Sequence, residues 1–209
     1  KAGRTPEGKK ATSGHTASVA GDYMVCESCI RQACAIVARS FTEFQDLFLL
    51  AEYISTKTIK GNRLASSCGA HFESLAIADS RQSVDYQMQL ASFSRSTVNR
   101  IGALLSRKRL DRLVTVSNPL DINPAADDEM HAEIAHILTD DGAVDAIVVG
   151  LDPLSPAMHT LAVDGEQAFS MDAENGVVSL LSGVVEKNRV PVIAVVDGGR
   201  QIPEARHPT

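Results

Sequence analysis

Short apolar runs that alternate with amphipathic helical patterns are the feature that most constrains the fold of this 209-residue chain. Apolar runs that predict strands lie at 63–67, 86–91, 113–117, 144–151 and 191–196, and helical patterns lie between them at 71–82, 94–108, 127–139 and 173–187. Strands that are apolar along their whole length are typical of a parallel sheet covered by helices on both faces. The sequence therefore predicts an α/β fold.

The first 58 residues have a different character. Residues 1–21 are rich in Gly, Ser, Thr, Lys and Ala without apolar periodicity, and we expect an extended loop there. Asp22 is expected to begin a helix that runs to about Cys34, followed by a short strand at 35–39 and a second helix from Phe41 to about Ser55.

Composition excludes several classes of protein. The chain carries 20 Lys and Arg against 26 Asp and Glu, a formal net charge of −6, and it has no Trp, which argues against a nucleic-acid partner. No apolar stretch approaches the roughly 18 residues that span a bilayer, so we expect no membrane partner. Without a secretory signal pattern, and with thiols expected to be reduced, we predict a cytoplasmic location.

Four cysteines raise the question of a metal or redox site: Cys26, Cys29, Cys34 and Cys68. A structural zinc site needs about four ligands, and no second Cys pair accompanies Cys26 and Cys29. The helical spacing of Cys26, Cys29 and Cys34 predicts small side chains buried on one helix face, with a metal or redox role as the alternative. We therefore expect no metal site in this chain.

His15 is the first candidate functional residue, because it lies in a basic segment of small residues. Neutral imidazole has a lone pair that can attack phosphorus, and nearby lysines offset phosphate charge. An exposed histidine with no chemical role is the alternative.

Two turns that follow predicted strands are the other candidates. Ser67, Cys68, Gly69 and Ala70 lie where a strand passes into a helix, so their N–H groups are expected at the positive end of a helix dipole and predict a phosphate site. An ordinary helix start is the alternative, and His71 is either a second phosphate contact or a plain exposed side chain. The Asn118–Asp121 turn either stabilises the loop or contacts a ligand at the end of a strand.

Together these segments resemble the NDP-forming acyl-CoA synthetases, which include ADP-forming acetate–CoA ligase, and their relatives the succinyl-CoA synthetases. The family's phosphohistidine loop is matched by Gly3-Arg4-Thr5, Gly8, Gly14-His15-Thr16-Ala17-Ser18 and Ala20-Gly21. Later segments fit as well: Gly61-Asn62-Arg63, Asn118-Pro119-Leu120-Asp121 and Val190-Pro191-Val192.

The resemblance implies an acid–thiol ligase that interconverts acyl-CoA, ADP and phosphate with acid, CoA and ATP through a phosphohistidine. It implies that His15 is the catalytic residue and that Ser67, Cys68, Gly69 and Ala70 bind phosphate. The implied supports of the loop and the implied turn near the site are Gly3, Arg4, Gly8, Gly14 and Thr16, and Asn118 and Asp121.

The resemblance also implies a domain organisation. Residues 1–58 would be the phosphohistidine loop and the tail of a flavodoxin-like domain, and residues 60–209 a second, succinyl-CoA synthetase-like flavodoxin-like domain that lacks a final helix and strand. CoA, ATP or ADP and Mg²⁺ would be bound by the full enzyme rather than by this chain, on CoA-binding and ATP-grasp domains in the same chain or in a partner subunit of an oligomer. The chain alone would be inactive.

Two other functions stay open. One is a non-catalytic module that senses CoA esters or another metabolite, which is favoured by Cys68 where the family has glycine and opposed by the presence of His15. The other is a structural interaction domain whose loop docks a partner chain.

Overall fold

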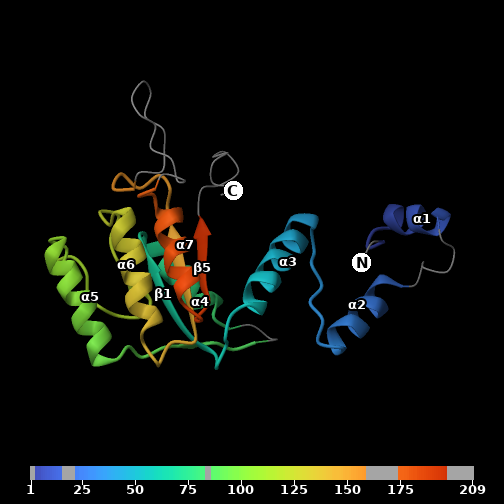
Figure 1. The fold of residues 1–209 in the computed structure, drawn as a ribbon. Coiled ribbons are helices and arrows are strands. Elements are labelled where there is room, and N and C mark those ends of the chain that lie inside the picture. Colours follow the sequence, from blue (N-terminus) through green and yellow to red (C-terminus); the bar gives the residue numbers. More distant parts are fainter. Residues whose placement is uncertain (1–2, 16–21, 83–85, 159–173, 197–209) are drawn as a thin grey trace, which may run out of the picture. The chain divides into compact units, whose positions relative to one another are not determined.

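The computed structural model describes residues 3–15, 22–82, 86–158 and 174–196. It divides into two compact units, Lys1–Ser55 and Thr56–Thr209, which we call the N-terminal unit and the sheet unit. The first contains helices α1 (Pro6–His15), α2 (Tyr23–Gln32) and α3 (Phe41–Ser55), shown in blue shades in Figure 1. Each unit is described below by itself.

Helix α1 overturns the prediction of an extended loop for much of residues 1–21. Thr5 caps the helix, because its Oγ1 accepts a hydrogen bond from the Gly8 N–H at 3.1 Å and its carbonyl accepts one from Lys9. Pro6 occupies the first helical position, where its fixed φ and missing N–H are tolerated, and Glu7 lies in the first turn. The Thr-Pro-Glu sequence thus starts a helix, although the small residues around it favour a loop.

Helices α2 and α3 begin where the sequence predicts. The Asp22 carboxylate accepts hydrogen bonds from the N–H groups of Met24 and Val25 at the start of α2, and the Ser40 hydroxyl accepts one from Glu43 at the start of α3. The strand predicted at 35–39 does not form, since no strand among the described residues of this unit is available to pair with it.

The prediction of buried cysteines is wrong for the N-terminal unit. Cys29 and Cys34 are exposed and Cys26 is half-buried. Helix α2 has no buried residue, so its apolar face has no core to enter among the described residues. Cys68, in the sheet unit, is buried.

The sheet unit is built from alternating strands and helices. The strands are β1 (Arg63–Cys68), β2 (Gln89–Leu90), β3 (Leu120–Asp121), β4 (Ala146–Leu151) and β5 (Val192–Val196), and the helices are α4 (His71–Ser80), α5 (Arg95–Arg107), α6 (Asp128–Thr139) and α7 (Val177–Lys187). All named strands pair in parallel, in the order β2-β1-β4-β5, with β3 on the same edge of β1 as β2. The predicted α/β, flavodoxin-like fold class is confirmed.

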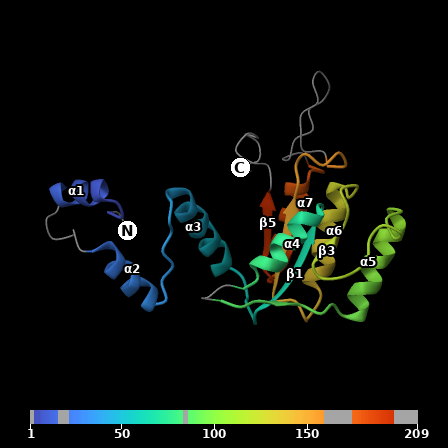
Figure 2. The same ribbon diagram turned by 180° about the vertical axis from the view of Figure 1, so that it is seen from behind.

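Helices cover both faces of this sheet (Figures 1 and 2). Helices α6 and α7 lie on one face, where Ile147, Val149 and Leu151 of β4 enter the buried apolar core. Helix α4 lies on the other face, as the view from behind shows, and its Glu73 carboxyl lies beside Gly150. The alternation along β4 therefore separates an apolar layer from a layer that contains polar groups.

Two predicted strands are shorter than expected. The run 86–91 forms a strand only at Gln89–Leu90, and the run 113–117 forms none, with Leu113 67% exposed. The second ladder instead begins at Leu120, after the Asn118–Pro119 turn. Within the run 113–117, Val114 and Val116 pack in or against the core without pairing as a strand. The loop predicted at 153–167 lies partly outside the described residues.

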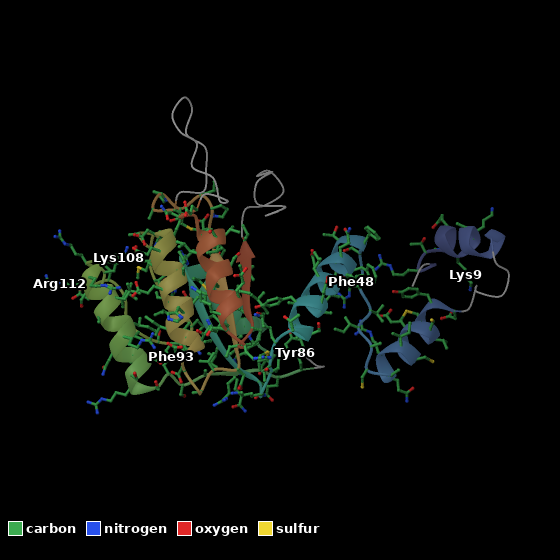
Figure 3. The ribbon with its side chains drawn as sticks, viewed as in Figure 1. Lys9, Phe48, Tyr86, Phe93, Lys108 and Arg112 are labelled. Atoms are coloured by element: carbon green, nitrogen blue, oxygen red, sulfur yellow. The ribbon has the colours of Figure 1, made fainter. Side chains whose placement is uncertain are left out.

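Helix α5 is tied to the start and the exposed side of α6 by ion pairs. Arg107 contacts Glu133 at 2.6 Å, and Lys108 contacts Asp127 at 2.8 Å and Glu129 at 2.6 Å. In Figure 3, Lys108 and Arg112 are labelled at the same end of α5. Exposed ion pairs of this kind contribute little stability each, so this face is best described as a solvated, charge-paired surface.

Candidate anion site at the carboxyl end of the sheet

The β1–α4 turn, Gly69 and Ala70, lies where buried strand β1 passes directly into helix α4. Ala70 is the N-cap residue with extended backbone, and no side chain caps the helix. The Ala70 carbonyl accepts the Glu73 N–H at 3.2 Å, which leaves the N–H groups of the first two residues of α4 at the positive end of the helix dipole. This is the geometry that binds anions at the carboxyl edge of a parallel sheet.

The two residues that precede the turn direct their side chains into opposite layers. Cys68 pairs with Gly150 and lies on the α4 side, while Ser67 pairs with Val149 and lies on the opposite side. Both residues are fully buried. Contact between an anion and this turn would therefore fall to the backbone of Gly69 and Ala70 rather than to these two side chains.

Cys68 sits in a crowded polar pocket under α4. A methyl group on Gly150 would lie 3.1 Å from the Cys68 sulfur and 2.8 Å from a Glu73 carboxyl oxygen, so only glycine fits there without a shift. Burial raises the pKa of the Cys68 thiol to about 11, with the neighbouring Ser74 hydroxyl acting in the opposite direction. The thiol is therefore protonated at neutral pH and is a poor nucleophile.

His71 and Asp121 meet at the mouth of the turn. The His71 Nδ1 lies 3.0 Å from Asp121 Oδ2, and the His71 side chain is 76% exposed. The other Asp121 oxygen accepts the Asn123 N–H at 3.1 Å, which fixes the carboxylate at the end of β3. A carboxylate thus orients an exposed imidazole at the first residue of α4.

Asn118 bridges the gap between β2 and β3. Its Oδ1 accepts the Ser66 N–H at 3.1 Å, and its Nδ2 donates to the carbonyls of Leu64 at 2.8 Å and Ala91 at 2.9 Å. One amide side chain therefore replaces part of the strand ladder along β1. This contact supports the stabilising interpretation of the Asn118 turn and holds the end of β1 in place.

His131, on the first turn of α6, lies on the core side of the β1–α4 turn. A methyl group on Gly69 would lie 3.7 Å from both Cε1 and Nε2 of its ring. The residue is 1% exposed, and burial lowers its pKa to about 4, with Asp127 acting in the opposite direction. The ring is therefore neutral at pH 7.

The structure describes most of the predicted residues of the N-terminal unit. Gly3 has a φ of 90°, which glycine adopts without strain, and Arg4 is exposed just before α1. Gly8 lies in the first turn of α1. A methyl group on Gly8 would lie 3.4 Å from the Cα atom of Gly3. Gly14 and His15 end α1, and Thr16 lies outside the described residues.

Neither a metal centre nor a membrane segment is found in the part of the chain that the structure describes. No group of three or more His, Cys, Asp and Glu residues there is arranged to hold a metal ion. No described helix is both long enough and apolar enough to cross a bilayer.

These features define an α/β protein with a flavodoxin-like parallel sheet and an open helix N-terminus at its carboxyl edge. Residues 1–51 match the family model described as a succinyl-CoA ligase like flavodoxin domain. The chain is 36% identical over 122 residues to an ADP-forming acetate–CoA ligase of Methanocaldococcus jannaschii, covering 58% of this chain and 16% of that protein.

Two longer matches agree with these. The alpha subunit of ADP-forming acetate–CoA ligase II of Pyrococcus furiosus is 24% identical over 205 residues, covering 91% of this chain and 42% of that one. The solved structure of Ca. Korarchaeum cryptofilum dinucleotide forming acetyl-coenzyme A synthetase 1, in complex with phosphate and ADP, superposes with a TM-score of 0.68 at 24% identity, covering 98% of this chain and 39% of that one.

The chain is thus similar to segments of ADP-forming acetate–CoA ligases, which agrees with the resemblance seen in the sequence. It spans less than half the length of these relatives.

Sequence reasoning missed two residues beside the turn, Glu73 and His131. Both are polar residues at core-facing positions of helices, and both are at least nine-tenths buried. For His131 a signal was available, since it shares one face of α6 with Ile134, Ala135 and Leu138 at spacings of three, four and seven residues.

Proposed function

We propose that the protein containing this chain is an NDP-forming acyl-CoA synthetase in which His15 carries a phosphoryl group. The phosphoryl group of an acyl phosphate would pass to the His15 imidazole, forming an N–P bond as the P–O bond to the acid breaks. It would then pass to ADP, and the imidazole would be released. A covalent carrier divides one transfer between distant sites into two in-line steps.

The observation that carries this proposal is the open N-terminus of α4 at the β1–α4 turn, in a chain whose first 51 residues match the succinyl-CoA ligase like flavodoxin model. Uncapped N–H groups stabilise the negative phosphoryl oxygens. Of the four predicted phosphate-binding residues, we assign contact with the phosphate to the backbone of Gly69 and Ala70, and Ser67 and Cys68 would hold this turn at the end of β1. Gly3, Arg4, Gly8, Gly14 and Thr16 would support the segment around His15, and Asn118 and Asp121 would hold the edge of the anion site.

The remaining parts of the reaction belong to other segments of the enzyme. CoA, ATP or ADP and Mg²⁺ would bind to CoA-binding and ATP-grasp domains, in the same chain or in a partner subunit of an oligomer. Residues 1–58 would complete one flavodoxin-like domain, and residues 60–209 would form a second. We place the protein in the cytoplasm and expect the 209-residue chain alone to be inactive.

The test uses the full protein. Incubation with ATP and Mg²⁺ should produce an acid-labile, base-stable phosphate that mass spectrometry places on His15. His15→Ala should abolish both this phosphate and acyl-CoA formation, whereas the matched variant His136→Ala, on the exposed side of α6, should retain both. Normal acyl-CoA formation by His15→Ala would contradict the proposed role.

A sensor of CoA esters is the second candidate function. It is favoured by the Glu73 carboxyl, which is 7% exposed in the first turn of α4, where an acidic group offsets the attraction of the helix N-terminus for phosphate. The two functions differ in turnover. Calorimetry showing that the full protein binds a CoA thioester, together with no phosphate on His15 and no acyl-CoA formation, would support the sensor.

A further inference from the structure

Two buried polar groups on the core side of the β1–α4 turn have no hydrogen-bond partner within the described part of the chain. They are the Nδ1 of His131 and the hydroxyl of Ser67. Residue exposure is 1% for His131 and 0% for Ser67. A buried polar group left without a partner costs roughly 1–3 kcal/mol, so a fold that keeps an imidazole there calls for an explanation.

The His131 ring turns its Cε1–Nε2 edge toward Gly69, and its unpartnered Nδ1 is the nitrogen on the other side of Cε1. Its Cε1 and Nε2 form the edge of the ring nearest to Gly69, each 3.7 Å from the position of an added methyl group. Gly69 immediately precedes the N-cap residue Ala70, which has no side-chain cap of its own. The imidazole of His131 and the N–H groups of the first two residues of α4 therefore border the same turn.

The chemistry of this imidazole suits a phosphoryl oxygen. A neutral ring presents one N–H donor, and burial keeps this ring neutral at pH 7. Asp127, the charged group that opposes the lowering of the His131 pKa, contacts Lys108 at 2.8 Å through one oxygen. Its other oxygen accepts the Met130 N–H at 2.9 Å, so both carboxyl oxygens of Asp127 already have a partner.

We propose that His131 is a phosphate-binding residue, whose ring donates one hydrogen bond to a phosphoryl group held by the β1–α4 turn. The proposal rests on the anion site of the proposed function and adds to it a donor from a second helix, α6. The Glu73 carboxyl lies in the other layer, against Gly150, so the donor and the acidic group act on opposite sides of β1.

The first experiment titrates the ¹⁵N-histidine-labelled 209-residue chain with inorganic phosphate at pH 7.5 and constant ionic strength. We expect the ring nitrogen resonances of His131 to shift with the occupancy of the site. The His136 resonances provide the internal control, because that residue lies on the exposed side of the same helix. A ring with a purely structural role would not shift, so unchanged His131 resonances at saturating phosphate would overturn the proposal.

The second experiment separates His131 from the anion site itself. His131→Phe keeps an aromatic ring without donors, and we expect phosphate to bind about tenfold more weakly to this variant, the usual effect of losing a hydrogen bond to a charged group. Ala70→Asp places a carboxylate at the N-cap and should abolish binding. Since His131→Phe could disturb packing, His131→Gln and a circular dichroism spectrum of each variant accompany the measurement.

The outcomes distinguish the two proposals. Unchanged affinity in both His131→Phe and His131→Gln, with binding lost in Ala70→Asp, would overturn the role of His131 and leave the anion site intact. Binding that survives Ala70→Asp, or no binding by the wild-type chain, would overturn the anion site and His131 together.

A further arm identifies the source of the phosphoryl group. The chain is phosphorylated on histidine with phosphoramidate, and the His131 resonances are compared between the wild type and His15→Ala. A shift in the wild type that is absent from His15→Ala supports delivery by His15. A shift of the His131 resonances that appears only with free phosphate supports a site for inorganic phosphate. Either result, delivery by His15 or binding of free phosphate, supports the contact of His131 with a phosphoryl group.

Discussion

At the scale of single residues, Asn118 holds together the main-chain segments that lead to the β1–α4 turn. Its side chain makes three hydrogen bonds with main-chain groups of Leu64, Ser66 and Ala91 along the edge of β1. An Asn followed by Pro predicts a turn, and the structure contains one. The bridging of two short strands could not be predicted, because it depends on residues 27 to 54 positions away.

Asn118→Ala should destabilise the sheet unit by about 2–4 kcal/mol, because it leaves main-chain donors and acceptors of β1 unpaired. Denaturant unfolding followed by circular dichroism measures the change. Ser117→Ala is the matched control in the same turn, since its exposed hydroxyl contacts only the Pro119 carbonyl, and it should stay within about 0.5 kcal/mol of the wild type. Equal effects of the two variants would contradict the bridging role.

The four cysteines should differ sharply in reactivity. Cys29 and Cys34 are exposed, whereas Cys68 is buried with a pKa of about 11. Iodoacetamide at pH 8 should therefore modify Cys29 and Cys34 within minutes and leave Cys68 unmodified until the chain is unfolded. Peptide mass spectrometry measures each site, and rapid labelling of Cys68 in the native chain would contradict the buried position.

At the scale of elements, helix starts were the most predictable features and strands the least. Asp22, Ser94 and Asp127 all cap helices as the sequence predicts, because a cap depends on residues two or three positions away. Helix α1 was not predicted, although Thr5 and Pro6 are also residues that favour a helix start. Strand lengths were overestimated at 86–91 and 113–117, since pairing depends on distant partners.

The contribution of a helix cap to stability can be measured at the start of α5. Ser94→Ala removes the hydroxyl that accepts the Thr97 N–H at 3.2 Å and should lower the free energy of unfolding by about 1 kcal/mol. Ser106→Ala, at an exposed position of the same helix, is the control and should be neutral or slightly stabilising. Thermal unfolding compares them, and a Ser94→Ala midpoint equal to that of Ser106→Ala would argue against the cap.

At the scale of the whole molecule, two buried groups make the sheet unit sensitive to acid. The pKa of His131 is about 4 in the folded state and near 6.5 in the unfolded state, so the unfolded chain takes up a proton first and stability falls as the pH drops from about 6.5 to 4. The hydrogen bond from Arg63 lowers the pKa of Asp145, so its contribution is present above about pH 3.8 and is lost as pH falls through the folded-state pKa.

His131→Phe should flatten the stability curve between pH 6.5 and 4, because it removes the group whose proton uptake favours unfolding. The wild type should lose up to about 1.4 kcal/mol per pH unit within that window. The acid loss below about pH 4, to which Asp145 contributes, should remain in both proteins. Denaturant unfolding at half-unit pH steps provides the measurement, and parallel curves for the two proteins between pH 6.5 and 4 would contradict the buried neutral imidazole.

The sequence by itself determined the fold class, the resemblance to a family, most helix starts and the candidate turn at Gly69 and Ala70. These follow from periodicity, caps and local motifs, which act over a few residues. Only the tertiary structure decided that Asn118 replaces part of a strand, that Asp121 orients His71, and that His131 faces Gly69 from another helix. Those contacts join segments that lie 27 to 62 residues apart, and their existence depends on how the sheet and its helices pack.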